Sequence, residues 1–194
     1  FLIGLIMAFQ AAIPMKQFGA EIFVADLIAL STLRELGPLM TAIVMAGRTS
    51  SAFAAELGTM KVNEEVDALT TMGLDPVRFL VLTRVIATLF MMPLITIFAN
   101  LFGILGGSVV LLSMGYPLNT YIDRIIQSAD YVDLLGGLLK SLAFGLIVAG
   151  IGCSHGLRTR TGASAVGDST TKAVVSGIIM IILTDGLFSV VYFY

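Results

Sequence analysis

The chain has 194 residues, of which 57% are hydrophobic and 12% are charged, and its formal net charge is −2. Soluble domains carry about 25% charged residues, so this composition excludes an ordinary soluble globular domain, and the slight acidity gives no indication of nucleic-acid binding. We therefore expect one domain, residues 1–194, that is all-α: a polytopic transmembrane helix bundle of about five membrane segments.

The first apolar segment runs from Phe1 to about Ile13 and is broken by Gln10 and Pro14. It is shorter than the ~20 residues that a membrane-spanning helix needs, so we expect it to be truncated, with an N-terminal segment of the natural protein preceding it. Residues 15–33 are mixed in polarity, with Lys16, Glu21 and Asp26, and we place them outside the hydrocarbon core or in a re-entrant stretch buried by protein. An adaptable apolar track, whose spacing favours bundle core or lipid-facing surface, consists of Met7, Ala11, Met15 and Phe18.

The second segment, Leu36–Leu57, is rich in small residues, which let helix backbones approach closely in a membrane, so we expect it in the middle of the bundle. It carries Arg48 and Glu56, which a helix places on one face about 12 Å apart. Because they are too distant to bond directly, each should find a partner on another helix or loop. Arg34-Glu35 stands at the outer start of this segment, either as an interfacial pair or as a contact for a polar head group.

Residues 58–84 are the most polar part of the chain and should form a short amphipathic helix between two membrane helices. Asn63 would cap it, with acidic residues in its first turn and Gly73 at its end. Its apolar face would hold Val62, Val66 and Leu69. Asp75-Pro76 then reads as the cap and first residue of the next helix.

No charged residue lies between Arg84 and Asp123. This run is longer than one span needs and shorter than two spans with a turn. We favour one long helix from about Pro76 to Met114, bent or straight at Pro93; a tight hairpin near residues 100–107 is the alternative. Residues 117–131 should then form a short outer-side amphipathic helix.

The fourth segment, about Leu134 to Ser154, contains Lys140, and the fifth, Ala173 to Tyr194, contains Asp185; a polar loop, 155–172, joins them. Charged groups inside a membrane are costly and usually face the bundle interior. Lys140 and Asp185 lie at matching depths along their helices, so we predict that they pair. The pair is either purely structural or a coupling element that rearranges during transport.

Basic residues in the loops indicate the orientation, because Lys and Arg concentrate on the cytoplasmic side. The loops 58–84 and 155–172 share one side by parity and hold Lys61, Arg78, Arg84, Arg158, Arg160 and Lys172. The opposite side holds Lys16, Arg34 and Arg124. We therefore expect the first two loops in the cytoplasm and the C-terminus outside.

No catalytic or metal-binding constellation is present in the sequence, which has one cysteine, Cys153, and one histidine, His155. Uphill work would need an ion gradient or a partner. We see no inverted repeat of the kind found in many secondary transporters. A short cytoplasmic helix between two spans suits a partner ATPase, and the alternative is a self-contained channel or ion-coupled transporter that uses Arg48, Glu56, Lys140 and Asp185.

Three stretches closely resemble the MlaE/YrbE-type permeases of ABC lipid transporters: LRELGPLMTAIVMAGRTSSAFAAELGTMKVNEEVDALTTMGLDPVRFLVLTRVIA, PLITIFANLFGILGG and GASAVGDSTTKAVVSGIIMIILTDGLF. They begin at Leu33, Pro93 and Gly162, and the resemblance spans essentially the whole chain. It implies a homodimer in the bacterial inner (cytoplasmic) membrane, bound to a cytoplasmic ABC ATPase and to an MCE-domain protein on the outer side. The implied cargo is phospholipid or a related lipid, and ATP is used by the ATPase, so this chain itself would bind no cofactor or metal and would not be an enzyme.

The resemblance also implies site residues. The family's coupling helix maps onto residues 61–72, with ATPase-coupling positions at Lys61, Val62, Glu64, Glu65, Val66, Asp67, Leu69 and Met72. Its lipid pocket maps near Met7, Ala11, Pro14, Met15 and Phe18, with Arg34 and Glu35 close by. The family's N-terminal interfacial helix has no counterpart in this sequence.

Overall fold

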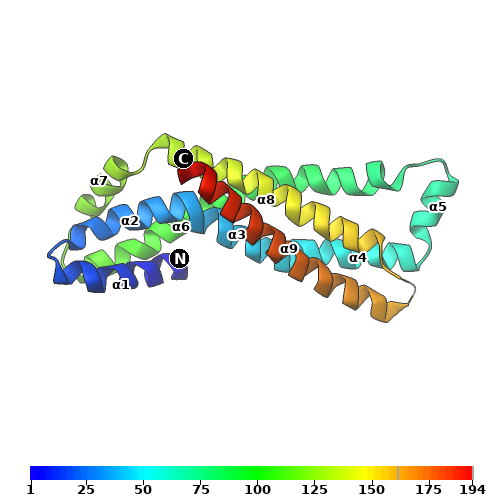
Figure 1. Ribbon diagram of the computed structural model, residues 1–194, viewed down its shortest axis with the longest axis horizontal. Coiled ribbons are helices and arrows are strands. Elements are labelled where there is room, and N and C mark those ends of the chain that lie inside the picture. The colour runs from blue at the N-terminus through cyan, green and yellow to red at the C-terminus, as the bar shows by residue number, and fades with distance from the viewer. Residues whose placement is uncertain (161, 194) are drawn as a thin grey trace. The chain divides into compact units, whose positions relative to one another are not determined.

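The computed structural model describes residues 1–160 and 162–193, and every regular element in these ranges is helical (Figure 1). The longer helices are α1 (Leu2–Gln17), α2 (Val24–Ser31), α3 (Gly37–Met45), α4 (Ser51–Val62), α5 (Glu65–Thr71), α6 (Leu82–Ser113), α7 (Leu118–Ser128), α8 (Tyr131–Leu157) and α9 (Ala163–Phe193). Within these ranges, four continuous helical stretches are long and apolar enough to cross a membrane: Glu21–Val62, Val77–Ser113, Tyr131–Leu157 and Ser164–Val191. The prediction of an all-α polytopic transmembrane bundle is confirmed.

The chain divides into two compact units, each built from discontinuous stretches. The first unit consists of Phe1–Pro38 and Leu94–Leu139. Small residues on one face of α1 lie against the second half of α6, and a Cβ added to Gly4 would come within 1.8 Å of the carbonyl oxygen of Gly103. The core of this unit is apolar and is formed by Ala8, Ala12, Val24, Ala25, Ile28, Val110, Leu111 and Tyr121.

Helix α7 contributes one buried tyrosine, Tyr121, to the core of this first unit. The Tyr121 hydroxyl donates a hydrogen bond of 2.7 Å to the carbonyl of Ile104, and only 3% of Tyr121 is exposed. Burial raises the pKa of Tyr121, so the hydroxyl stays protonated and remains a donor. The predicted short amphipathic helix at 117–131 is confirmed as Leu118–Ser128.

The second unit consists of Leu39–Pro93 and the described residues from Lys140 onward. Here α4 lies beside α9 (Figure 1). Small side chains allow the approach: Ala46, Ser50 and Ala54 are fully buried, and a Cβ added to Gly177 of α9 would lie 3.6 Å from the Cβ of Ala46. On α8, a Cβ added to Gly152 would come within 2.7 Å of the carbonyl oxygen of Ser50. Within this unit, the predicted packing of the small-residue face is confirmed.

The second membrane helix begins earlier than the sequence indicated. Residues from Glu21 to Val62 form one continuous helical stretch, so Arg34-Glu35 is not at a helix start. Within 21–33, Val24, Ala25 and Ile28 are buried by protein, and the placement of this stretch relative to the hydrocarbon core stays a prediction. Two π-helical turns interrupt the regular pattern, at Thr32–Leu36 and Ala46–Ser50. The first ends two residues before Pro38, which has no N–H to donate to the carbonyl of Arg34, and a widened turn accommodates this missing hydrogen bond.

Three other boundaries also differ. Helix α1 continues through Gln10 and Pro14 to Gln17, because Pro14 sits in the last turn and removes only one hydrogen bond. Asn63 is the residue after α4 rather than the cap of α5, and Glu64 precedes α5 with a left-handed φ of 63°. Helix α9 begins at Ala163, so the predicted polar loop 155–172 contracts to a few residues between α8 and α9. Thr161 in that loop and the predicted end of the fifth segment at Tyr194 lie outside the described residues.

Other boundaries agree. The run from Val77 to Ser113 is one helical stretch, so the single long helix is confirmed and the hairpin at 100–107 is wrong. Gly73, with φ of +80°, follows the end of α5 as predicted. The Asp75 carboxylate accepts a hydrogen bond of 2.9 Å from the backbone N–H of Val77, which is the geometry of the predicted cap.

Candidate functional site

A short helix with one buried side joins two membrane helices in the second unit. Helix α5 links the end of α4 to the stretch that leads into α6 (Figure 1). Val66 is 6% exposed and packs in a cluster with Leu57, Leu80 and Cys153, while Leu69 is half-buried against the same cluster. The predicted apolar face is confirmed for Val66 and Leu69, and Val62 is half-buried.

The opposite side of α5 is acidic and open. Glu64, Glu65, Asp67 and Met72 are exposed. One ion pair holds the helix to the end of α4, because Lys61 Nζ lies 2.6 Å from Asp67 Oδ1. The eight residues assigned to coupling thus form one structural feature, with an apolar side seated on three membrane helices and an acidic side free to meet another surface.

An arginine at the start of α6 adds a second link that sequence reasoning did not assign. The guanidinium of Arg84 lies 2.9 Å from Glu56 on α4, and it donates a hydrogen bond of 2.8 Å to the carbonyl of Leu80. Its central carbon also lies 5.8 Å from the centre of the Phe53 ring, within the range of a cation–π contact. The prediction that Glu56 has a partner on another helix is therefore confirmed.

The corresponding prediction for Arg48 is wrong for the described residues. Arg48 is exposed, and within residues 1–160 and 162–193 its side chain has no ion-pair or hydrogen-bond partner. It lies in the π-helical turn Ala46–Ser50, where the residue spacing departs from that of a regular α-helix. Sequence spacing assumes a regular helix and so misplaced it.

Lys140 and Asp185 form an ion pair in the interior of the second unit. Lys140 is fully buried, Asp185 is 16% exposed, and Lys140 Nζ lies 2.5 Å from Asp185 Oδ1. The predicted pairing is confirmed. A buried ammonium is tolerated only when a counter-charge compensates its lost hydration, so each residue explains the presence of the other within a membrane span.

A second charge pair lies in the first unit. Arg34 Nε donates to Asp133 Oδ1 at 2.5 Å; the arginine side chain is 56% exposed and the aspartate 5% exposed. Asp133 also accepts a hydrogen bond of 3.2 Å at Oδ2 from the backbone N–H of Asp130, the residue before α8. This contact is the half of a capping box in which the third helical residue accepts from the backbone N–H of the cap residue; the return bond, of 3.0 Å from Asp133 N–H, goes to the backbone carbonyl of Asp130. The spacing of Asp130 and Asp133 was the sequence signal for it, and it was missed.

The positions assigned to a lipid pocket lie on α1, in the loop after it, and in the π-helical turn Thr32–Leu36. Met7, Ala11 and Met15 are half-buried along one edge of α1, whereas Pro14 and Phe18 are exposed, with Phe18 81% exposed. Glu35 is half-buried and takes part in a polar interaction. Within the described ranges, no group of three His, Cys, Asp or Glu side chains is placed to hold a metal ion.

Comparison with known proteins extends along nearly the whole chain. The family described as Permease MlaE matches residues 1–191. Probable ABC transporter permease proteins of Synechocystis and Rickettsia typhi are 41% and 36% identical over 185 and 194 residues, which cover 94% and 100% of this chain and 70% and 75% of the relatives. The Intermembrane phospholipid transport system permease protein MlaE of Haemophilus influenzae is 32% identical over 193 residues, 98% of this chain and 74% of the relative.

Proposed function

The chain belongs to the MlaE permease family, and we propose that it is the membrane subunit of an ABC transporter that moves phospholipid or a related lipid between the bacterial inner membrane and the outer envelope. In this proposal the chain acts as a homodimer and has no ATPase site of its own. A cytoplasmic ATPase supplies the energy, and an MCE-domain protein on the outer side continues the lipid path.

The observation that carries the proposal is the construction of α5. Its apolar side is seated on Leu57 of α4, Leu80 before α6 and Cys153 of α8. A force on the exposed acidic side would therefore reach three membrane helices through close-packed contacts, since packed interiors transmit displacement rather than absorb it. The Glu56–Arg84 pair joins α4 to α6 just beyond this cluster. A self-contained transporter would have no use for a rigid, exposed helix of this kind.

The lipid-facing part of the proposal rests on the first unit. The exposed guanidinium of Arg34 keeps donors free beyond its bond to Asp133, and arginine binds phosphate oxygens in a bidentate manner. The half-buried residues Met7, Ala11 and Met15 on α1 offer an adaptable surface for acyl chains. The name of the Haemophilus relative, which refers to phospholipid transport, supports the choice of cargo.

Reconstitution tests the proposal. The chain is co-expressed with its candidate ATPase, purified, and inserted into vesicles that contain fluorescent phospholipid. We expect the ATPase to co-purify and lipid movement to require ATP, with an ATPase inactivated in its nucleotide site as the control. Lipid or ion movement by the chain alone, driven by a proton gradient and independent of ATP, would support the ion-coupled alternative and refute the proposal.

A further inference from the structure

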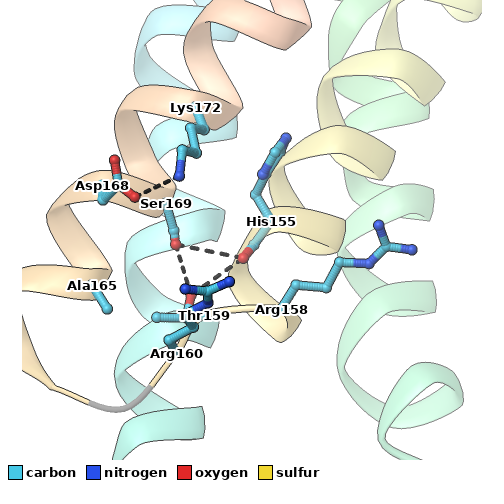
Figure 2. Close-up of a pocket in the computed structure, with 8 residues that line it drawn as sticks. All are labelled: His155, Arg158, Thr159, Arg160, Ala165, Asp168, Ser169 and Lys172. Atoms are coloured by element: carbon cyan, nitrogen blue, oxygen red, sulfur yellow. Dashed lines mark hydrogen bonds and ion pairs between the residues drawn. The ribbon is translucent and has the colours of Figure 1, made fainter.

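A cavity lined by more basic than acidic side chains lies where α8 ends and α9 begins. It has a volume of about 210 Å³ and is lined by His155, Arg158, Thr159, Arg160, Ala165, Asp168, Ser169 and Lys172 (Figure 2). Thr159 and Ser169 are 9% and 7% exposed, and their hydroxyl oxygens lie 2.7 Å apart. Both hydroxyls also point at the carbonyl of His155, so the floor of the cavity is polar and internally hydrogen-bonded.

The cations at this cavity outnumber its carboxylates. Lys172 and Asp168 pair with each other at 2.6 Å. Arg158 and Arg160 are exposed, and their side chains have no ion-pair or hydrogen-bond partner among the described residues. Figure 2 shows Arg160 beside Thr159 and Ser169, whereas the side chain of Arg158 extends away from them. The cavity therefore has an uncompensated guanidinium at its edge, which favours an anionic ligand.

An apolar groove adjoins the cavity. It has a volume of about 310 Å³, shares His155 and Lys172 with the cavity, and continues along α9 past Val175 and Ser176 to Ile179. His155 and Ser176 are joined across it by a hydrogen bond of 2.9 Å. The cavity and the groove thus meet at His155 and Lys172, with the charged cavity near the loop between α8 and α9 and the apolar groove along α9.

The location matches the boundary between head groups and hydrocarbon. One candidate span ends at Leu157 and the next begins at Ser164, so the cavity lies at the ends of two spans and the groove lies within one of them. Basic pockets between membrane helices at this depth suit the head groups of anionic lipids. We propose that this joined cavity and groove is a binding site for one anionic phospholipid, with its phosphate at Arg160 and an acyl chain along Val175 and Ile179.

This site lies in the second unit and uses none of the residues assigned to the transported lipid, so it would bind a resident lipid of the surrounding leaflet. The phosphate chemistry alone would also suit free phosphate. The adjoining groove favours the lipid, because an acyl chain gains from burial at an apolar wall and a free anion does not.

The chain contains no tryptophan, so a single introduced one reports on its own surroundings. Ile182→Trp places it about one turn beyond Ile179, at a residue that is 55% exposed. The protein is reconstituted in phosphatidylcholine bilayers with increasing phosphatidylglycerol brominated on its acyl chains, which quenches nearby tryptophan; brominated phosphatidylcholine is the reference lipid. We expect half-maximal quenching at a fraction of the anionic lipid about tenfold lower than the fraction of brominated phosphatidylcholine that is needed. A tenfold difference in affinity corresponds to the contribution of one charge-assisted hydrogen bond. Leu187→Trp, also exposed but eight residues (about 12 Å) beyond Ile179 along α9, lies past the end of the groove and should show no preference.

Charge variants then identify the head-group contact. Arg160→Gln should remove the preference, and Asp168→Asn should increase it, because a competing carboxylate is gone. Arg78→Gln, whose side chain is 88% exposed and lies away from the cavity, is the matched control and should change nothing. An unchanged thermal midpoint shows that each variant is folded, and a preference that survives Arg160→Gln in folded protein overturns the proposal.

Two further outcomes would assign the site to another occupant and overturn the lipid proposal. The first is binding of inorganic phosphate, measured by calorimetry, that is lost in Arg160→Gln but unaffected by closing the groove with Val175→Phe. The second is an Arg160→Gln protein that retains its lipid preference but no longer co-purifies with an ATPase, which would make the arginine a protein contact.

Discussion

The Lys140–Asp185 pair offers the sharpest test of how this bundle tolerates charge. At the observed separation of 2.5 Å, Coulomb's law with an effective dielectric constant of about 20 gives an attraction of about 7 kcal/mol. The cost of removing two ions from water is several kcal/mol per ion and offsets most of it. We therefore expect the pair to be nearly neutral overall, and either residue alone to be strongly destabilising.

The perturbation is a double-mutant cycle with Lys140→Met, Asp185→Leu and both together. Each single variant leaves one charge buried and uncompensated, so we expect a loss of about 3–5 kcal/mol in the free energy of unfolding. The double variant replaces the pair by apolar groups of similar size and should lose less than either single variant. Arg78→Met, in an exposed pair with a separation of 3.8 Å, is the control and should change little.

The assay is denaturant-induced unfolding of the purified protein in mixed micelles, with lipid transport measured in parallel. A double variant that loses the sum of the two single losses would refute the reasoning, because independent sites add and coupled ones do not. The transport measurement separates the two roles left open for the pair. If the double variant is stable and still transports lipid, the wild-type pair is structural. If the double variant is stable but inactive, the wild-type pair rearranges during transport.

The remaining predictions concern packing and contacts elsewhere. Glu65→Lys should lower co-purification of the ATPase without changing the unfolding midpoint, because Glu65 is exposed, whereas Val66→Asp should destabilise α5 by placing a carboxylate in an apolar cluster; an unchanged complex with Glu65→Lys counts against the coupling role. Gly137→Ala should cost about 1–3 kcal/mol of unfolding free energy, because its Cβ would come within 2.1 Å of the Leu33 carbonyl oxygen. Gly150→Ala on the same helix meets nothing within 4 Å and should stabilise by roughly 0.5–1 kcal/mol, and equal effects at the two positions would contradict the packing described. Asp133→Asn should lower the free energy of unfolding by about 1–3 kcal/mol, because it weakens the charge-assisted bond with Arg34. If the two residues act through this one contact, the loss should be no larger than that of Arg34→Gln at low and at high salt. An unchanged free energy of unfolding in Asp133→Asn would show that the pair does not stabilise the protein.

The sequence by itself determined the features that depend on local composition and on the thickness of a bilayer. The length of the uncharged run favoured one span over a tight hairpin, since two spans and a turn need more residues, and the structure has one helical stretch from Val77 to Ser113. The short helix α5 followed from its apolar face and from Gly73, whose φ of +80° suits glycine. The pairing of Lys140 with Asp185 followed from matched depth, because an unpaired charge inside a membrane is too costly at both positions.

The tertiary structure decided which stretches that contain charged residues continue a membrane-spanning helix. Residues 21–33 looked too polar to join the second membrane helix, but Asp26 lies 3.8 Å from Arg124 and Arg34 is paired with Asp133, partners far along the chain that no local pattern reveals. The early start of α9 is similar, because Lys172 and Asp168 neutralise each other one turn apart. The π-helical turn at Ala46–Ser50 interrupts the regular helical spacing that was assumed for Arg48 and Glu56. Local polarity thus predicts which segments are helical, and the partners that compensate each charge decide where those helices begin and which side chains are free to bind.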